Sequence, residues 1–131
     1  MKRLIAALST VVALAIALFS TNPIRRVVVE GRSMLRAYAP GDRLLVESVT
    51  YRLRLPRIGE VVAVKNAASG RLDLKRIAAG PGASVMVAGA DCVLGPDEWY
   101  VLGDNLDESQ DSRTLGPVKT KDIVGRVWFR Y

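Results

Sequence analysis

Residues 72–82 read LDLKRIAAGPG and join a strand-like pattern to a tight turn. Successive side chains of a strand point to opposite faces, so the run divides into two sets. One set is Asp73, Lys75 and Ile77, and the other is Leu74, Arg76 and Ala78. The Gly-Pro-Gly at 80–82 ends the strand. The run therefore predicts a strand that places a lysine among apolar neighbours.

Short apolar runs rich in β-branched residues recur along residues 23–131 and predict further strands. With the run above, the predicted strands are 26–30, 43–47, 60–65, 72–78, 84–87, 99–102 and 123–131. Gly- and Pro-rich turns separate them, and no segment after residue 22 keeps a helical period beyond one or two turns. We predict a mainly β fold, a compact antiparallel sheet or barrel-like domain behind one N-terminal transmembrane helix.

The predicted transmembrane helix lies in residues 4–20, LIAALSTVVALAIALFS, which contain no ionisable side chain. As a helix they would reach about 25 Å, near the lower limit for crossing a hydrocarbon core. Residues 1–22 are expected to form a short cytoplasmic flank and a single-pass anchor that ends near Asn22-Pro23. A cleaved signal peptide has a similar pattern, but bulky residues around Phe19 do not suit its cleavage site. Basic residues flank the segment on both sides, so charge alone does not decide its orientation.

Composition excludes several kinds of site. The chain has 131 residues, no histidine and one cysteine, Cys92. These counts rule out a Ser-His-Asp triad, a Cys-His pair, a histidine-ligated metal and an intrachain disulfide. An enzymatic base must therefore be Lys, Asp, Glu, Tyr or a terminal amine, and we expect no metal and no cofactor. Cys92 is expected to be a small buried apolar residue without a role.

The net charge is +6, and residues 21–131 carry 17 basic and 13 acidic side chains. A modest positive charge suits a domain beside anionic lipid headgroups. No motif or interleaving of aromatic and basic residues supports nucleic-acid binding. The expected partner from charge is thus a lipid bilayer and not a nucleic acid.

Three segments could carry chemistry. Burial of Lys75 would disfavour its ammonium form and supply a neutral amine, although the amine could also reach solvent from a sheet edge. Ser33 follows a valine-rich strand and a glycine, Gly31, that allows close approach of another backbone. Residues 103–113 are dense in hydrogen-bonding groups and, taken alone, would also fit a surface loop.

The order of these segments carries a resemblance. The chain reads Gly31-Arg32-Ser33-Met34, then Pro40-Gly41-Asp42, Gly59-Glu60-Val61, Lys75-Arg76-Ile77 with Gly80-Pro81-Gly82, and Gly103-Asp104-Asn105 with Ser109-Gln110-Asp111-Ser112-Arg113. Over residues 27–131 this resembles the type I signal peptidase family of membrane-anchored Ser-Lys endopeptidases. The Gly-Asp-Asn and Ser-x-Asp-Ser-Arg segments are its most specific part.

The resemblance implies roles for individual residues. Ser33 would be the nucleophile, Lys75 the general base and Ser109 the group that orients the lysine amine. The Ser33 main-chain N–H would donate a hydrogen bond to the oxyanion. Some relatives have a serine, with a second donor, at the position of Gly31. The ion pairs expected to support the site are formed by Arg76, Asp104, Asp111 and Arg113. The residues expected to line pockets for small substrate side chains at −1 and −3, or else to be ordinary core, are Val27, Val29, Met34 and Leu74.

The resemblance also has gaps. Arg36-Ala37 stands where the family commonly has Pro-Thr, and Leu106 replaces a usual arginine. The expected function is a serine endopeptidase in the cell membrane, with its catalytic domain, residues 23–131, on the outer face. It would remove signal sequences from exported preproteins after small residues. Two alternatives are a maturation peptidase dedicated to one precursor, of the nickel superoxide dismutase type, and an inactive membrane-tethered binding domain. The related self-cleaving repressor peptidases need a DNA-binding domain and a cytosolic location, and the predicted anchor and the absence of a helix-turn-helix pattern argue against them.

Overall fold

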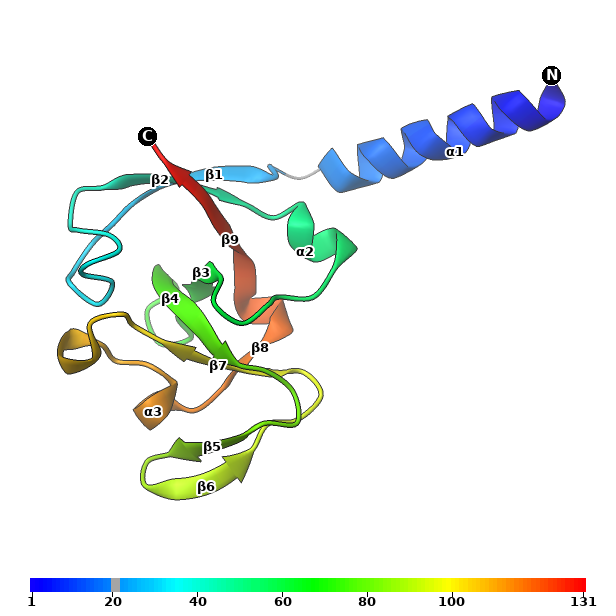
Figure 1. Cartoon of the computed structure of the whole chain (residues 1–131). Helices are drawn as coiled ribbons and strands as arrows, with labels where there is room; N and C mark the ends of the chain where they lie inside the picture. The colour runs from blue at the N-terminus through cyan, green and yellow to red at the C-terminus, as the bar shows by residue number, and fades with distance from the viewer. Residues whose placement is uncertain (20–21) are drawn as a thin grey trace.

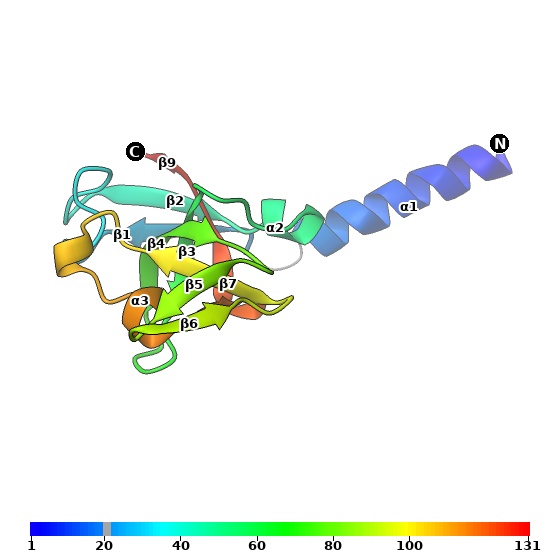
Figure 2. The same cartoon turned by 60° about the horizontal axis from the view of Figure 1, so that its bottom comes forward.

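The structure, a computed structural model, describes residues 1–19 and 22–131 (Figures 1 and 2). Its strands are β1 (Ile24–Val28), β2 (Arg43–Glu47), β3 (Val61–Lys65), β4 (Leu72–Ala79), β5 (Ser84–Val87), β6 (Ala90–Val93), β7 (Glu98–Leu102), β8 (Val118–Lys119) and β9 (Ile123–Arg130). Its helices are α1 (Lys2–Phe19), α2 (Thr50–Leu53) and α3 (Ser112–Leu115), with 3-10 turns η1 (Leu106–Glu108) and η2 (Thr120–Asp122). The prediction of a mainly β chain is confirmed.

The main sheet has the strand order β1-β2-β9-β3-β4-β7-β8, and its neighbouring strands pair antiparallel. Register shifts interrupt the ladders at Leu45/Val46, Ala63/Val64 and Ile77/Ala79. Such bulges bend a strand and increase its twist. The sheet accordingly curls into a half-barrel instead of lying flat (Figures 1 and 2).

The core lies on both faces of the central strands. Val61 and Ala63 of β3 pack with Leu74 in one buried cluster, whereas Val62 and Val64 pack with Ile77 in another. Leu74 and Ile77 therefore face opposite sides of β4, as the alternation predicts. Residues 61–64 of β3 form a continuous apolar run, as expected for a strand that is covered on both faces.

The β5–β6 hairpin projects from the main sheet (Figure 1). The sequence predicted its first strand, β5, but not its second, β6. Ala88 and Gly89 form its two-residue turn with positive φ of 49° and 82°, which suits a type I′ hairpin. Alanine rarely adopts this conformation, so the sequence carried no hairpin signal here. Cys92 lies on β6 between the exposed residues Asp91 and Val93 and is itself partly exposed, which corrects the expectation of a buried cysteine.

The helix α1 extends from the β domain in both views, and its residues 1–17 are exposed (Figures 1 and 2). Two of its eighteen residues, Lys2 and Arg3, are charged. Among residues 1–19 and 22–131 no helix is long and apolar enough to cross a membrane, so the predicted transmembrane anchor is not confirmed. Ser20, the predicted end of the anchor segment, and Thr21 lie outside the described residues.

Candidate active site

Lys75 lies in the middle of β4, opposite Val62 of β3, and is 7% exposed. Its Nζ donates a hydrogen bond to Ser109 Oγ at 3.2 Å. Burial lowers the pKa of Lys75, the nearby charge of Arg113 lowers it further, and Asp73 and Asp111 act in the opposite direction. The net result is a lysine pKa below the ordinary value, so the neutral amine forms at lower pH than in water.

Asp111 anchors the other end of this hydrogen-bond chain. Ser109 Oγ and the Gly103 main-chain N–H donate to Asp111 Oδ2 at 2.8 and 3.0 Å, and Arg113 Nε donates to Oδ1 at 2.8 Å. The aspartate is only 2% exposed. Burial raises its pKa, but the hydrogen bonds outweigh burial and lower the pKa below the ordinary value. Asp111 therefore stays ionised beside the lysine.

Ser109 links Lys75 to Asp111, and the hydrogen-bond donation runs from the lysine through the serine to the aspartate. Its single hydroxyl proton goes to Asp111, which leaves an oxygen lone pair to accept from Lys75. The amine is thus held by a side chain whose own orientation is fixed. This is the contact that the family resemblance implied for Ser109.

Ser33 is held mainly through its backbone. It is half-buried in the turn that follows β1, and its carbonyl oxygen accepts from the Asn105 N–H at 2.8 Å. The Asn105 side chain donates to the Arg32 carbonyl at 3.1 Å, and the next residue, Met34, is 1% exposed and packs into the core. Within the described residues the Ser33 N–H has no hydrogen-bond partner, so it is free to meet a negative oxygen.

Gly103 brings the serine and lysine halves together. A Cβ on Gly103 would collide with the Ser109 side chain on one side and with the Ser33 carbonyl oxygen on the other. Only glycine fits between them. In the part of the chain that the structure describes, no hydrogen bond joins the side chains of Ser33 and Lys75, which line separate hollows. Such contacts often form only when substrate binds.

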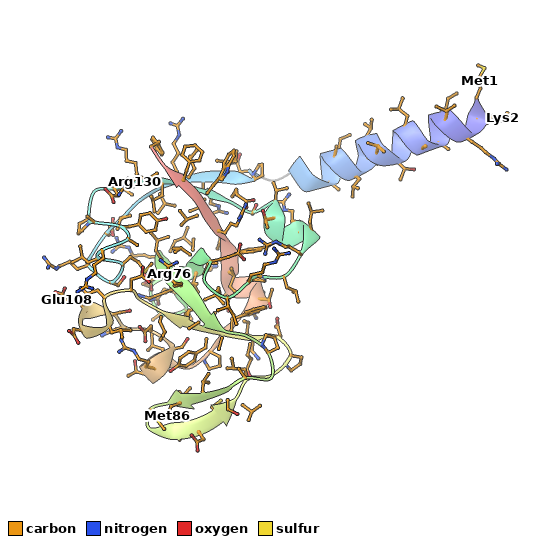
Figure 3. All side chains as sticks on the ribbon, in the orientation of Figure 1. Met1, Lys2, Arg76, Met86, Glu108 and Arg130 are labelled. Atoms are coloured by element: carbon orange, nitrogen blue, oxygen red, sulfur yellow. The ribbon has the colours of Figure 1, made fainter. Side chains whose placement is uncertain are left out.

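A second ion pair fixes the loop that begins at Gly103. Arg76 donates to both Asp104 oxygens, at 2.8 Å from Nε and 2.7 Å from Nη2, and its Nη1 donates to the Gly59 carbonyl at 2.7 Å. Two parallel bonds give this pair a defined geometry. Arg76 lies over the sheet, whereas Glu108, which belongs to the loop that begins at Gly103, lies at the edge of the domain (Figure 3).

A groove of about 600 Å³ opens beside Ser33. Its walls are residues 27–31, 33 and 34 on one side and residues 69 and 71–74 on the other. The four residues expected to bind substrate, Val27, Val29, Met34 and Leu74, all line it, and so does Gly31. Val29, Met34 and Leu74 are also buried core residues, so the core interpretation is confirmed for these three and substrate binding stays a prediction.

Lys75 lines a second hollow, of about 310 Å³, together with Asp73 and Asp111. Asp73 lines both hollows and accepts a hydrogen bond from Asn66 Nδ2 at 2.8 Å. Lys75 therefore lines a hollow separate from the groove that contains Ser33. Asp73 marks the boundary between the two.

The departures from the family pattern have structural counterparts. Arg36 adopts φ of 87°, which proline cannot reach, so the turn after Ser33 has a backbone incompatible with the usual proline. The N–H groups of Ala37 and Tyr38 instead close this turn on the Met34 carbonyl, at 3.1 and 2.8 Å. Leu106 contributes its carbonyl, which accepts from Arg113 Nη2 at 2.6 Å.

Two residues of the site had no role from sequence. Gly103 separates the two halves, and Asn105 holds the Ser33 turn. Both belong to the Gly-Asp-Asn tripeptide, which the resemblance singled out as a motif without giving these two residues a role. Ser33 and Arg32, which these two residues approach, lie 70 or more positions earlier in the chain. No local sequence pattern shows contacts over such a separation.

Comparison with known proteins finds relatives over most of this chain. Probable thylakoidal processing peptidase 2 of Arabidopsis thaliana is 32% identical over 130 residues, an alignment that covers 76% of this chain and 35% of that protein. Probable signal peptidase I-1 of Synechocystis is 29% identical over 130 residues, covering 76% and 66%. Signal peptidase I of Leptolyngbya laminosa is 29% identical over 144 residues, covering 82% and 71%. The chain thus spans from about a third to under three quarters of these relatives.

The family model of signal peptidases, peptidase S26, matches two overlapping segments, residues 1–94 and 89–131. Together these segments include every residue placed in the site above. The chain belongs to the signal peptidase family, peptidase S26.

Proposed function

We propose that this protein is a serine endopeptidase that removes N-terminal signal sequences from exported preproteins, with residues 23–131 as its peptidase domain. The observation that carries the proposal is the buried Lys75, whose amine is held by Ser109 and whose pKa is lowered by burial. A serine hydroxyl needs a base to become a nucleophile, and the chain has no histidine. A lysine with a lowered pKa meets that need.

The reaction proceeds in two halves. Ser33 Oγ attacks the substrate carbonyl carbon while its proton passes to the neutral Lys75 amine, and the free Ser33 N–H donates to the developing oxyanion. The C–N bond breaks, and the leaving amine takes the proton from Lys75. A water molecule then gives its proton to Lys75 and attacks the acyl group. The ester bond breaks, and the proton returns to Ser33 Oγ.

The supporting residues hold this geometry. Arg113 and Asp111 keep Ser109 aimed at the lysine, and Arg76 with Asp104 fixes the loop beside them. Ser33 reaches Lys75 when substrate fills the groove and tightens the turn. Since a misplacement of about 1 Å can slow a reaction about a hundredfold, these contacts are important although they touch no substrate.

The groove supports a preference for small residues. We assign the apolar pockets formed by Val27, Val29, Met34 and Leu74 to the substrate side chains at −1 and −3. Their buried walls belong to the packed core, so they yield little to a bulky side chain. Gly31 contributes no hydroxyl to the oxyanion site, which leaves the Ser33 N–H as the donor we assign there.

We further propose that α1 holds the protein at a lipid bilayer, with the catalytic domain on the outer face. Residues 4–17 are exposed and uncharged, which is unfavourable in water and favourable in lipid. Co-flotation of the whole chain with anionic phospholipid vesicles tests the association. Flotation that survives replacement of Leu8 and Val12 by aspartate would contradict the role given to α1.

Cleavage of a preprotein with an Ala-x-Ala junction tests the activity. Wild-type protein in detergent should cut at the junction, and Lys75→Ala should not cut although its circular dichroism spectrum is unchanged. Cleavage by Lys75→Ala at the wild-type rate would contradict the proposed base. Lys65→Ala, a lysine at the end of the neighbouring strand β3, is the matched control and should cut normally.

A further inference from the structure

The groove beside Ser33 has a charged rim above an apolar floor. Glu30 on the β1 side and Arg71 on the β4 side form an ion pair between the two walls of the groove. Their side chains are 70% and 66% exposed, whereas the floor residues Val29 and Leu74 are buried. The pair therefore stands where the groove opens to solvent.

An extended substrate would present alternate side chains to floor and rim. β1 is the terminal strand of the main sheet, and among residues 1–19 and 22–131 the segment 72–75 of β4 pairs only with β3, so both walls offer a strand edge that no described strand covers. A peptide between them would lie as a strand, with successive side chains on opposite faces. If the substrate side chains at −1 and −3 enter the apolar floor of the groove, the substrate side chain at −2 points to Glu30 and Arg71.

The charges at this rim are unequal. Arg71 is one cation, but Glu30 and Asp73 are two carboxylates that line the same groove. Asp73 has a neutral partner, the Asn66 amide, so its charge is not cancelled by an ion pair there. A positive side chain at −2 meets more attraction than a negative one.

We propose that Glu30 and Arg71 read the charge of the substrate residue at −2 and favour a basic residue over an acidic one; this deepens the proposed function and rests on it. A lysine at −2 takes the place of Arg71 beside Glu30, and an aspartate at −2 pairs with Arg71 but faces two carboxylates. Exposed ion pairs are weak, so the pair opens readily when substrate enters. The expected preference is about two- to fivefold.

Peptides with the junctions Ala-Lys-Ala and Ala-Asp-Ala measure this preference as a ratio of kcat/KM. Glu30→Ala should lower the Lys-to-Asp ratio, and Arg71→Ala should raise it, each by about two- to fivefold. A change in the Lys75 pKa caused by either variant affects both peptides alike and cancels in the ratio. Arg130→Ala breaks another exposed ion pair, with Asp42, and is the matched control at the C-terminal end of β9 (Figure 3).

Three results separate the possibilities. Opposite shifts in the two variants, with none in Arg130→Ala, support the proposal. An unchanged ratio, or a shift of the same sign in both variants, overturns it. Failure of the wild type to cut an Ala-Ala-Ala peptide would contradict the proposed function instead. The charge preference is then tested by binding of the same two peptides to the Ser33→Ala protein, where equal affinities overturn it.

Discussion

The two halves of the site are held in different ways. Lys75 lies inside a sheet, and its amine ends a chain of side-chain hydrogen bonds through Ser109 to the buried Asp111. Ser33 lies in a turn, and its position depends on main-chain contacts, above all the hydrogen bond from Asn105 to its carbonyl. Gly103 contacts both halves closely, at the Ser109 side chain and at the Ser33 carbonyl.

The half that contains Lys75 therefore controls the protonation of the base, and the half that contains Ser33 controls the position of the reacting hydroxyl. Buried charges stabilise or destabilise each other strongly, so changes around Lys75 alter its pKa and the folding free energy. The turn around Ser33 carries no buried charge, so changes there should alter the position of the hydroxyl and leave stability nearly intact. The predictions that follow test this division.

Ser33→Ala gives the largest expected loss of activity. Removal of the nucleophile should reduce kcat/KM by about a thousandfold or more. The Ser33 side chain has no hydrogen-bond partner among the described residues, so the melting temperature should stay within about 1 °C of wild type. Thermal melts and peptide cleavage measure the two effects. A strongly destabilised Ser33→Ala protein would contradict the separation of the two halves.

Asp111→Ala should reduce both stability and activity. It leaves Ser109, the Gly103 N–H and Arg113 without their shared acceptor, which should lower the free energy of unfolding by about 3 kcal/mol. Urea denaturation measures this loss. Asp107→Ala, at an exposed position in the same loop, is the control and should change it by less than about 0.5 kcal/mol. Equal effects at the two positions would mean that the buried network is unimportant.

Gly103→Ala should affect the contact between the halves. The added methyl group must displace Ser109 or the Ser33 carbonyl, so kcat/KM should fall about a hundredfold. Gly89→Ala adds a methyl group in the hairpin turn, where nothing lies within 4 Å; its φ of 82° strains an alanine there, but this strain is local to the hairpin and should leave kcat/KM unchanged. If Gly103→Ala cleaves as fast as Gly89→Ala, the close approach at Gly103 is not required.

Asp73→Asn should have the smallest effect, a shift in pH dependence. The negative charge of Asp73 raises the pKa of Lys75, so its removal lowers that pKa further. The base is active when neutral, and activity rises as pH rises through its pKa. The acidic limb of the kcat/KM profile should therefore move to lower pH. Asp91→Asn, on the exposed hairpin strand β6, should leave the limb in place, and a shift to higher pH in Asp73→Asn would refute the argument.

The sequence was informative where chemistry follows from residue type and alternation. The placement of Leu74 and Ile77 on opposite faces of β4 and the burial of Lys75 both agree with the pattern of one short run. The fold class followed from repeated apolar runs. These features depend on local periodicity, which a sequence displays directly.

The remainder depends on approaches between distant segments. The bond between Asn105 and Ser33 and the fit of Gly103 between the Ser109 side chain and the Ser33 carbonyl arise only after the sheet has curled. The unusual φ of Ala88 and Arg36 likewise gave no sequence signal, because neither residue is typical of that conformation. The predicted membrane span was not confirmed, although residues 4–19 of the apolar run lie in a helix.

The most direct test of the account is the titration of the Lys75 amine by NMR. Lysine labelled with ¹³C at the ε carbon gives a separate signal for each lysine, and the Lys75 signal is identified by its loss in Lys75→Arg. The account predicts a titration midpoint below the ordinary lysine value of about 10.4. It also predicts that the same pKa limits kcat/KM. A midpoint at or above about 10.4 would contradict the role of Lys75 as a buried neutral base.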